Sequence, residues 1–302
     1  MQNYLFLLNK QLHFWVILLH FIKTLPFWVI KWLKINIFLY FCNYTNQNNM
    51  ANEEDYFIAA NSVGAINEEQ YKKLDVLIHT TEAISRSLYQ SVYLIDYYKK
   101  GFLYVSENPL FLCGHTAKEM KELGYSFYSQ HVPEEEQQML LEINSNGFKF
   151  FETKITDEDK HKCYISYNFH ITLGGNRKIL INHKLTPILL TEDGRIWIAM
   201  CIVSLSSQST PGHVEFHIEG KQKFWKYDLD FHKWKEKEMI QLKEEEKQVL
   251  TLCSQGLTMN EIADKMCKSI DSIKFYRRTL FDKIGTKNIT EALTFATIYK
   301  LL

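Results

Sequence analysis

The sequence predicts an α+β protein in which an antiparallel sheet domain is followed by an all-α, four-helix domain. Three observations support this class. Strand-like segments between residues 91 and 205 are separated by turn clusters rich in Gly, Asn and Asp. After residue 242, helix-capping signals recur at short intervals. The length of 302 residues also leaves room for about two domains of ordinary size.

Charge is unevenly distributed along the chain, although the formal net charge is zero. Residues 50–220 hold 15 basic and 23 acidic side chains, whereas residues 221–302 hold 16 and 12. A basic C-terminal end is compatible with a polyanionic partner. The predicted division is an apolar segment (1–49), an N-terminal helix (50–90), a sheet domain (91–205), a linker and hairpin (206–241) and a helical domain (242–302).

The first 49 residues have an unusual composition, with four lysines and no Gly, Ala, Ser, Asp, Glu or Arg. Their longest strongly apolar stretch, Leu12–Ile22, is shorter than the roughly 18 residues that a membrane-spanning helix needs. No small-residue cleavage site for a signal peptide is visible. Two interpretations stay open: a mis-annotated extension before a true start at Met50, which gives a cytoplasmic protein, or an anchor that tethers the protein to a membrane.

The helical domain is predicted from its caps. Glu244–Glu246 place acids in the first turn of one helix, where the helix dipole favours them. Thr258–Glu261 form a capping box for a second, short helix. Ser269 caps a third helix and Asn288 a fourth. Two short helices joined by a tight turn, with the small residue Ala263 where they cross, form a helix-turn-helix.

The third of these helices, from Ser269 to Ile284, has two distinct faces. The face expected to be buried carries Ile273, Tyr276, Leu280 and Ile284. The opposite face carries Asp271, Phe275, Arg278 and Asp282, flanked by Lys274 and Thr279. Six basic residues stand against two acids between positions 268 and 287. Most charged runs are solvated helix faces, but an exposed Phe275 suits the thymine methyl groups of a DNA major groove.

The C-terminal residues resemble the LuxR/GerE-type DNA-binding domain, over about sixty residues and without a gap. The matching segments are Leu242–Leu250, Gln255–Thr258, Glu261–Ala263, Ser272–Lys274 and Lys283–Gly285. The resemblance implies that residues 272–278 enter the major groove of double-stranded DNA and that Lys287 reaches a phosphate. The predicted DNA-binding residues are Ser272, Lys274, Phe275, Arg277, Arg278 and Lys287.

The chain departs from this family at three positions. Lys268 stands where the family usually has Ile, Tyr276 where His is common, and Ile289 where Arg is common. The first and third departures weaken packing or phosphate contacts, but the groove-facing residues are kept. Sigma-factor DNA-binding domains share the helix geometry and are a minor alternative, since the chain lacks a recognisable second promoter-binding region.

The body of the chain is predicted from changes of hydrophobic period. An amphipathic helix over 67–88 is followed by two strands, a helix that begins at Asn108, a capping box at Thr116 and a helix from Pro133 to Ile143. The expected strands are Ser91–Tyr97, Phe102–Ser106, Phe148–Ile155, Cys163–Leu173, Lys178–Leu190 and Arg195–Leu205. This order resembles a PAS-type sensor domain, which implies a small pocket between sheet and helices for a small molecule or a protein partner.

The segment after the sheet domain is expected to join it to the helical domain. Ser204–Gly212 is the clearest linker, and strands over 213–219 and 223–228 would form a hairpin. Trp225 and Trp234 lie in a segment too short for a core of its own. We therefore expect them to dock on the body or on a second subunit.

The sequence offers little enzyme chemistry. It contains no phosphate-binding glycine loop, no HExxH and no nucleophile elbow, so no catalytic and no metal-ligating residues are predicted. The cofactor is left unknown: Cys113 is not in the context of a flavin-reactive cysteine, and His131 is a weak candidate for a haem ligand. We expect a cytoplasmic, dimeric transcription regulator. The alternatives are a protein-binding helix-turn-helix module and a haem or flavin redox sensor.

Overall fold

The computed structural model of the chain describes residues 51–299 and 301. The expectations for residues 1–49 lie outside the described residues. None of the helices in the described part combines the length and the apolar character that a bilayer crossing demands.

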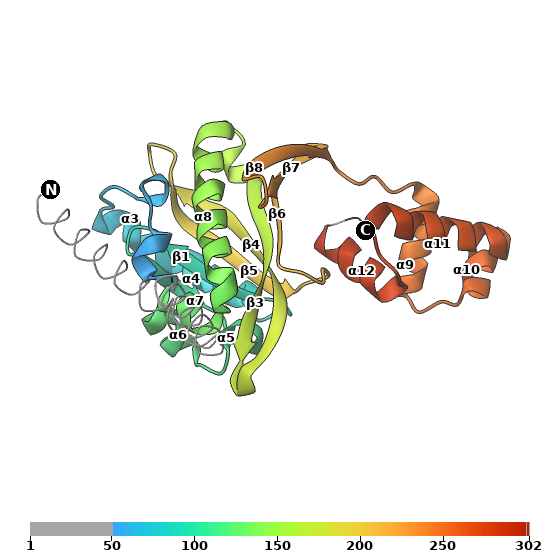
Figure 1. Cartoon of the computed structure of the whole chain (residues 1–302), viewed down its shortest axis with the longest axis horizontal. Coiled ribbons are helices and arrows are strands. Elements are labelled where there is room, and N and C mark those ends of the chain that lie inside the picture. Colours follow the sequence, from blue (N-terminus) through green and yellow to red (C-terminus); the bar gives the residue numbers. More distant parts are fainter. Residues whose placement is uncertain (1–50, 300, 302) are drawn as a thin grey trace, which may run out of the picture. The chain divides into compact units, whose positions relative to one another are not determined.

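An eight-stranded sheet forms the centre of the body (Figure 1). Its order is β2-β1-β5-β4-β3-β6-β7-β8, and every pair of neighbours is antiparallel, as predicted. The strands are β1 (Ser91–Asp96), β2 (Gly101–Val105), β3 (Cys163–Leu173), β4 (Arg177–Leu190), β5 (Ile196–Leu205), β6 (Gly212–Ile218), β7 (Lys223–Asp228) and β8 (Lys233–Glu238).

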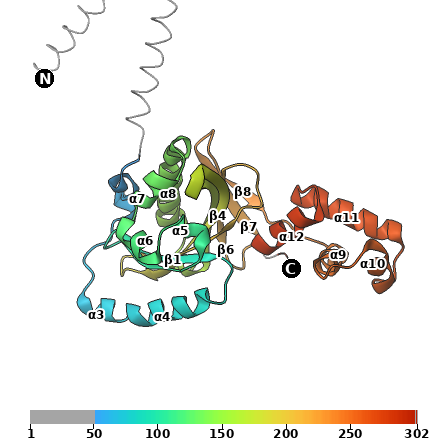
Figure 2. The ribbon, with the colours of Figure 1, turned by 90° about the horizontal axis from the view of Figure 1, so that it is seen from below.

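Helices cover both faces of the sheet (Figure 2). One face carries the short 3₁₀ turns η1 (Glu53–Tyr56) and η2 (Ala59–Asn61) with α5 (Pro109–Leu112), α6 (Ala117–Leu123), α7 (Ser126–His131) and α8 (Glu134–Lys154). The other face carries α3 (Glu68–Lys72) and α4 (Leu74–Ser85), where Leu74 packs with Leu94, Trp197 and Ile198. The predicted amphipathic helix over 67–88 is thus present as two pieces. The remaining 3₁₀ turns are η3 (Lys160–Lys162) and η4 (Gly174–Asn176).

The predicted strand Phe148–Ile155 is wrong, because these residues continue α8 to Lys154. Phe148-Lys149-Phe150 imitates the alternation of apolar and polar residues in a strand. However, the buried residues Phe148 and Phe151 are three positions apart, and the buried Ile155 follows four positions later, which is the spacing of a helix. Gly147 lies inside α8. A Cβ atom at this position would lie 2.9 Å from Cδ1 of Ile165, so the glycine lets α8 approach β3 closely.

The hairpin predicted over 213–219 and 223–228 is present as β6 and β7, and it extends the body sheet rather than standing apart from it. β6 pairs with β3, β7 pairs with β6, and a further strand, β8, forms the edge. The sequence did not reveal β8 because its alternating charges leave it almost entirely polar, as suits an exposed edge. Trp225 and Trp234 pack on Phe150 of α8, and their ring centroids lie 5.5 and 4.5 Å, respectively, from the centroid of the Phe150 ring. These contacts confirm the prediction that both tryptophans dock on the body.

The C-terminal domain has the four predicted helices: α9 (Glu244–Ser254), α10 (Met259–Lys265), α11 (Ile270–Ile284) and α12 (Ile289–Ile298). The capping residues are also as predicted. The side chains of Thr258, Ser269 and Asn288 each accept a hydrogen bond from the backbone N–H three residues later.

We predict that Trp234→Ala lowers the free energy of unfolding of the body by about 2–3 kcal/mol, because it removes a large side chain packed on Phe150. Denaturant unfolding followed by circular dichroism measures the change. The matched control is Phe231→Ala in the adjacent turn, where the aromatic ring is 67% exposed. Equal effects of the two substitutions would show that β8 does not contribute to the core of the body.

Candidate nucleic-acid interface and interior cavity

α11 is held against the rest of its domain by its apolar face. Ile273 and Leu280 are fully buried and Ile284 nearly so, while Tyr276 is half-buried. The four residues are those predicted from the sequence. Gly285 adopts a left-handed backbone conformation with φ of 69° and ends the helix. The residues opposite the apolar face are therefore presented to solvent in a fixed orientation.

An ion pair between the buried Glu246 of α9 and the solvent-accessible Lys283 of α11, whose side chain is 34% exposed, joins the two helices. The carboxylate of Glu246 is 2% exposed, lies 2.6 Å from Nζ of Lys283 and accepts a hydrogen bond of 2.8 Å from the N–H of Lys243. Burial disfavours the charged form, but the hydrogen bonds from Lys283 and from the Lys243 backbone outweigh it and keep the pKa of Glu246 below its ordinary value. From the sequence, Glu246 was assigned only to the favourable end of the helix dipole. Its ion pair with Lys283 was not predicted, because the two residues lie far apart in the chain.

The exposed face of α11 brings three of the predicted residues together. Phe275 is 51% exposed, and the guanidinium of Arg278 lies over its ring at 5.8 Å from the centroid. Lys274 is exposed beside them, with Nζ 3.2 Å from a carboxylate oxygen of Asp271. This arrangement offers two cations and an apolar ring on one helix face, which is the chemistry needed to contact phosphates and thymine methyl groups.

The other three predicted residues are placed differently. Ser272 is half-buried, and its Oγ lies 2.9 Å from Oγ of Ser269. Arg277 is turned towards α10: its guanidinium lies 5.4 Å from the Phe281 ring and 3.6 Å from Sδ of Met259. Lys287 lies outside α11, exposed in the turn before α12. Ser272 and Arg277 are thus engaged with other protein groups, and Lys287 is not part of α11.

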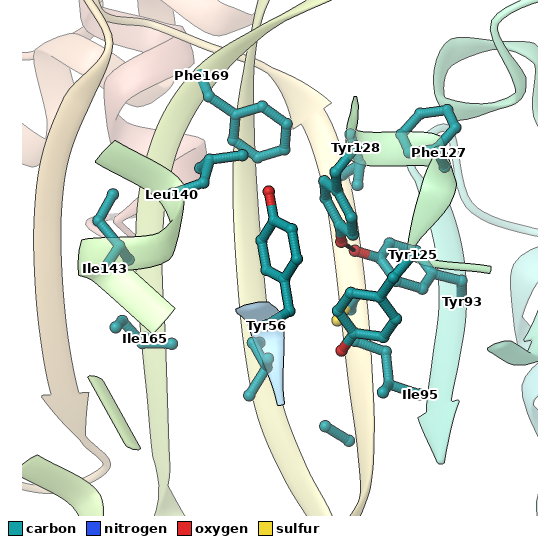
Figure 3. Packing of buried hydrophobic residues seen from close by; sticks show 14 of the residues in the cluster. Tyr56, Tyr93, Ile95, Tyr125, Phe127, Tyr128, Leu140, Ile143, Ile165 and Phe169 are labelled. Carbon is teal, nitrogen blue, oxygen red and sulfur yellow. Dashed lines mark hydrogen bonds between the residues drawn. The ribbon is translucent and has the colours of Figure 1, made fainter. Parts of the chain in front are cut away.

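The interior of the body contains a cluster of tyrosines between the sheet and its helices (Figure 3). The hydroxyl of Tyr93 lies 2.7 Å from the hydroxyl of Tyr128 and 2.5 Å from Nε2 of His183. The ring of Tyr56 packs against those of Tyr125 and Tyr128, at 5.5 and 5.3 Å between centroids. A cavity of about 20 Å³ borders this cluster, and a second cavity of about 30 Å³ shares Asn144 with it but is lined by none of these tyrosines.

Two polar atoms in this cluster have no hydrogen-bond partner among the described residues: the hydroxyl of Tyr56 and Nδ1 of His183. Both residues line the cavity of about 20 Å³, so a small polar group there would lie beside them. Burial lowers the pKa of His183 to about 3 and raises the pKa of Tyr56, which keeps both side chains uncharged. The sequence predicted a pocket but did not identify its residues, which come from distant segments.

The geometry of His131 and Cys113 bears on the cofactor alternatives. Nδ1 of His131 lies 3.1 Å from the carbonyl oxygen of Thr172, and its Nε2 lies 2.9 Å from Nε2 of His115. Both ring nitrogens are therefore engaged, which leaves neither to bind an iron atom in this arrangement. Burial raises the pKa of the Cys113 thiol to about 12, so it is not a reactive thiolate.

The C-terminal domain matches a known protein family. Residues 241–296 match the family model described as bacterial regulatory proteins, luxR family. The C-terminal domain is therefore a luxR-type helix-turn-helix domain, and it follows a domain built on an antiparallel sheet. A search of curated proteins finds no match to this chain.

Solved structures provide more distant likenesses. The VqmA dimer of Vibrio cholerae, described as a LuxR-type receptor, is 15% identical, covers 74% of this chain and 88% of its own, and gives a TM-score of 0.30. A phage VqmA–DPO complex is 14% identical, with coverages of 77% and 92% and a TM-score of 0.26. A PAS domain from Colwellia psychrerythraea is 11% identical, with coverages of 44% and 98% and a TM-score of 0.32. The function proposed for this chain does not rest on these likenesses.

We predict that the buried, neutral His183 makes the folded state less stable as the pH falls, because the unfolded chain binds a proton at this histidine more readily than the folded chain does. The unfolded chain binds this proton near the ordinary histidine pKa of about 6.5, whereas the folded chain excludes it down to about 3. The unfolded state therefore holds more protons in this window, and stability falls as the pH falls through it. His183→Gln should reduce the slope of unfolding free energy against pH by up to about 1.4 kcal/mol per pH unit between pH 6 and 4.

Denaturant unfolding at a series of pH values checks this slope. The control is His79→Gln, which changes an exposed histidine on α4. If the unfolding free energies of wild type and His183→Gln depend on pH in the same way, His183 is not the buried neutral group described above.

Proposed function

We propose that this protein is a sequence-specific DNA-binding transcription regulator, and that its sheet domain is the sensor that controls it. The observation that carries the proposal is the exposed face of α11, where Lys274, Phe275 and Arg278 stand together on the second helix of a luxR-type helix-turn-helix domain. In this motif the second helix lies in the major groove and its side chains contact base edges.

We further propose that the protein acts as a cytoplasmic homodimer. A single helix-turn-helix reads few base pairs, and a dimer reads two half-sites about 34–36 Å apart along the duplex. A reducing compartment is compatible with the cysteines of the described residues that are free thiols, among them Cys113, Cys163 and Cys201. The input to the sensor is a small molecule or a protein partner, and the tyrosine cluster supports the small molecule.

We predict that Lys274→Ala and Arg278→Ala each weaken binding to a specific DNA site by about 1–3 kcal/mol without changing the stability of the domain, because both side chains are exposed. Fluorescence anisotropy with a labelled duplex measures the affinity, and thermal unfolding checks the fold. Lys247→Ala, which removes an exposed lysine on α9, is the matched control. Unchanged affinity in both test variants would contradict the groove assignment.

A salt series separates DNA binding from the alternative of a protein-binding helix-turn-helix. If the domain binds phosphates, the logarithm of the affinity falls linearly with the logarithm of salt concentration. The slope is about −0.9 for each phosphate neutralised. A DNA affinity that does not respond to salt would favour a protein partner instead.

We predict that Phe275 recognises thymine through its methyl group. Replacing a contacted thymine by uracil, which lacks the methyl, should weaken binding of the wild-type chain by about 1 kcal/mol and should leave binding of Phe275→Ala unchanged. Because Phe275 is 51% exposed, the substitution should not destabilise the domain. Equal losses in wild type and variant at every thymine of the site would show that Phe275 does not contact this group.

A further inference from the structure

The acid in the first turn of α11 is used differently from those of the other three helices in its domain. Each of the others places a glutamate at its third position, where the carboxylate accepts a hydrogen bond of 2.8 Å from a backbone N–H three or four residues earlier and so caps the helix. These capping acids are Glu246 on α9, Glu261 on α10 and Glu291 on α12. In α11 the acid is Asp271, at the second position.

The cap of α11 comes from another residue. The hydroxyl of Ser269 accepts a hydrogen bond of 3.2 Å from the N–H of Ser272, so the Asp271 carboxylate is not needed for it. The Asp271 side chain is 90% exposed, and one of its oxygens lies 3.2 Å from Nζ of Lys274. An ion pair that is so exposed adds little to stability. The folding of the domain therefore does not explain why an acid stands here.

Asp271 belongs to the helix face that is proposed to contact DNA. Lys274, Phe275 and Arg278 follow it at intervals of three, four and seven residues, which places all four side chains in one line along α11. In a helix-turn-helix, residues near the N-terminus of the second helix contact base edges. Phosphates repel a carboxylate at this position, so Asp271 opposes DNA binding unless a base offers it a hydrogen-bond donor.

We propose that Asp271 is a specificity-determining residue that accepts a hydrogen bond from the N4 amino group of a cytosine, while Lys274 donates to O6 of the paired guanine. This inference rests on the DNA-binding function proposed above, and it names the base pair that the first turn of α11 reads. In the major groove a C·G pair presents the cytosine donor beside the guanine acceptor. The protein presents an acceptor and a donor side by side, the Asp271 carboxylate and the Lys274 ammonium.

The chemistry of a carboxylate disfavours the other bases. Guanine presents only the acceptors N7 and O6, and thymine presents the acceptor O4 beside its methyl group. A carboxylate has no proton to donate, so beside either base the Asp271 charge would be desolvated without a partner. Adenine presents a donor at N6 next to an acceptor at N7, a pattern that an amide matches better than a carboxylate does. Asp271 should therefore select cytosine, and an asparagine at its position should select adenine.

Helix geometry relates this cytosine to the thymine proposed for Phe275. The two residues are four positions apart, which corresponds to about 6 Å along the helix axis. Successive base pairs are about 3.4 Å apart along the duplex. We therefore expect the cytosine and the thymine to lie within about two base pairs of each other in each half-site.

The test is selection of bound duplexes from a random DNA pool with the full-length chain. Wild type should enrich a motif with cytosine at one position of each half-site, and Asp271→Asn should enrich adenine at that position. The matched control is Asp282→Asn, which removes the same charge from an exposed acid in the last turn of α11 and should keep the wild-type base preference. Thermal unfolding of both variants checks that the fold is intact.

A modified base tests the hydrogen bond itself with the unaltered protein. N4-methylcytosine pairs with guanine through its remaining N–H and turns its methyl group towards the major groove, so it offers no donor there. At the selected position it should weaken binding of wild type about tenfold in fluorescence anisotropy. Binding of Asp271→Ala should not change, because this variant has no carboxylate to lose the contact.

The inference is overturned if Asp271→Asn enriches the same motif as wild type, or if Asp282→Asn shifts the preference as Asp271→Asn does. It is also overturned if N4-methylcytosine affects wild type and Asp271→Ala equally. In each of these cases the chain still selects a DNA sequence, so the proposed function stands. If wild type enriches no motif at all, the proposed function is contradicted and this inference falls with it.

Discussion

The packing of α8 against the sheet is the contact to which many features of the body connect, and at its closest point a Cβ atom on Gly147 would lie 2.9 Å from Cδ1 of Ile165. Most of the other features are built on this helix. Its Asn144 holds the backbone of Tyr56, its Phe150 receives the tryptophans of the added strands, and its Glu142 accepts a hydrogen bond from the hydroxyl of Tyr227 on β7 at 2.8 Å. One helix thus contacts both the N-terminal segment around Tyr56 and the strands β7 and β8.

The helical domain relies on a different kind of interaction. Its cores are small, and an ion pair between the buried Glu246 and the partly exposed Lys283 joins the first helix to the end of α11. Removal of Lys283 would leave the buried carboxylate of Glu246 without its counter-charge, which is costly. Lys283 belongs to this pair, whereas Lys274 and Arg278 are exposed, so the cation that stabilises the domain is distinct from the two proposed to contact DNA.

Local features were predictable from the sequence, and distant ones were not. The caps at Thr258 and Ser269 join residues three apart, so they can be read directly from the chain. The faces of α11 follow from helical periodicity for the same reason. In contrast, Phe148–Ile155 satisfies both a strand and a helix pattern, and only packing against the sheet decides between them. The unpaired hydroxyl of Tyr56 depends on contacts with elements far along the chain, which no local pattern encodes.

The central claim is that the exposed face of α11 reads base pairs, and selection of bound duplexes from a random DNA pool with the full-length chain tests it most directly. The expected result is a shared motif with two-fold symmetry, enriched by wild type and lost in Arg278→Ala. No enrichment over a shuffled pool, or the same motif at the same strength in Arg278→Ala and Lys274→Ala, would contradict the claim.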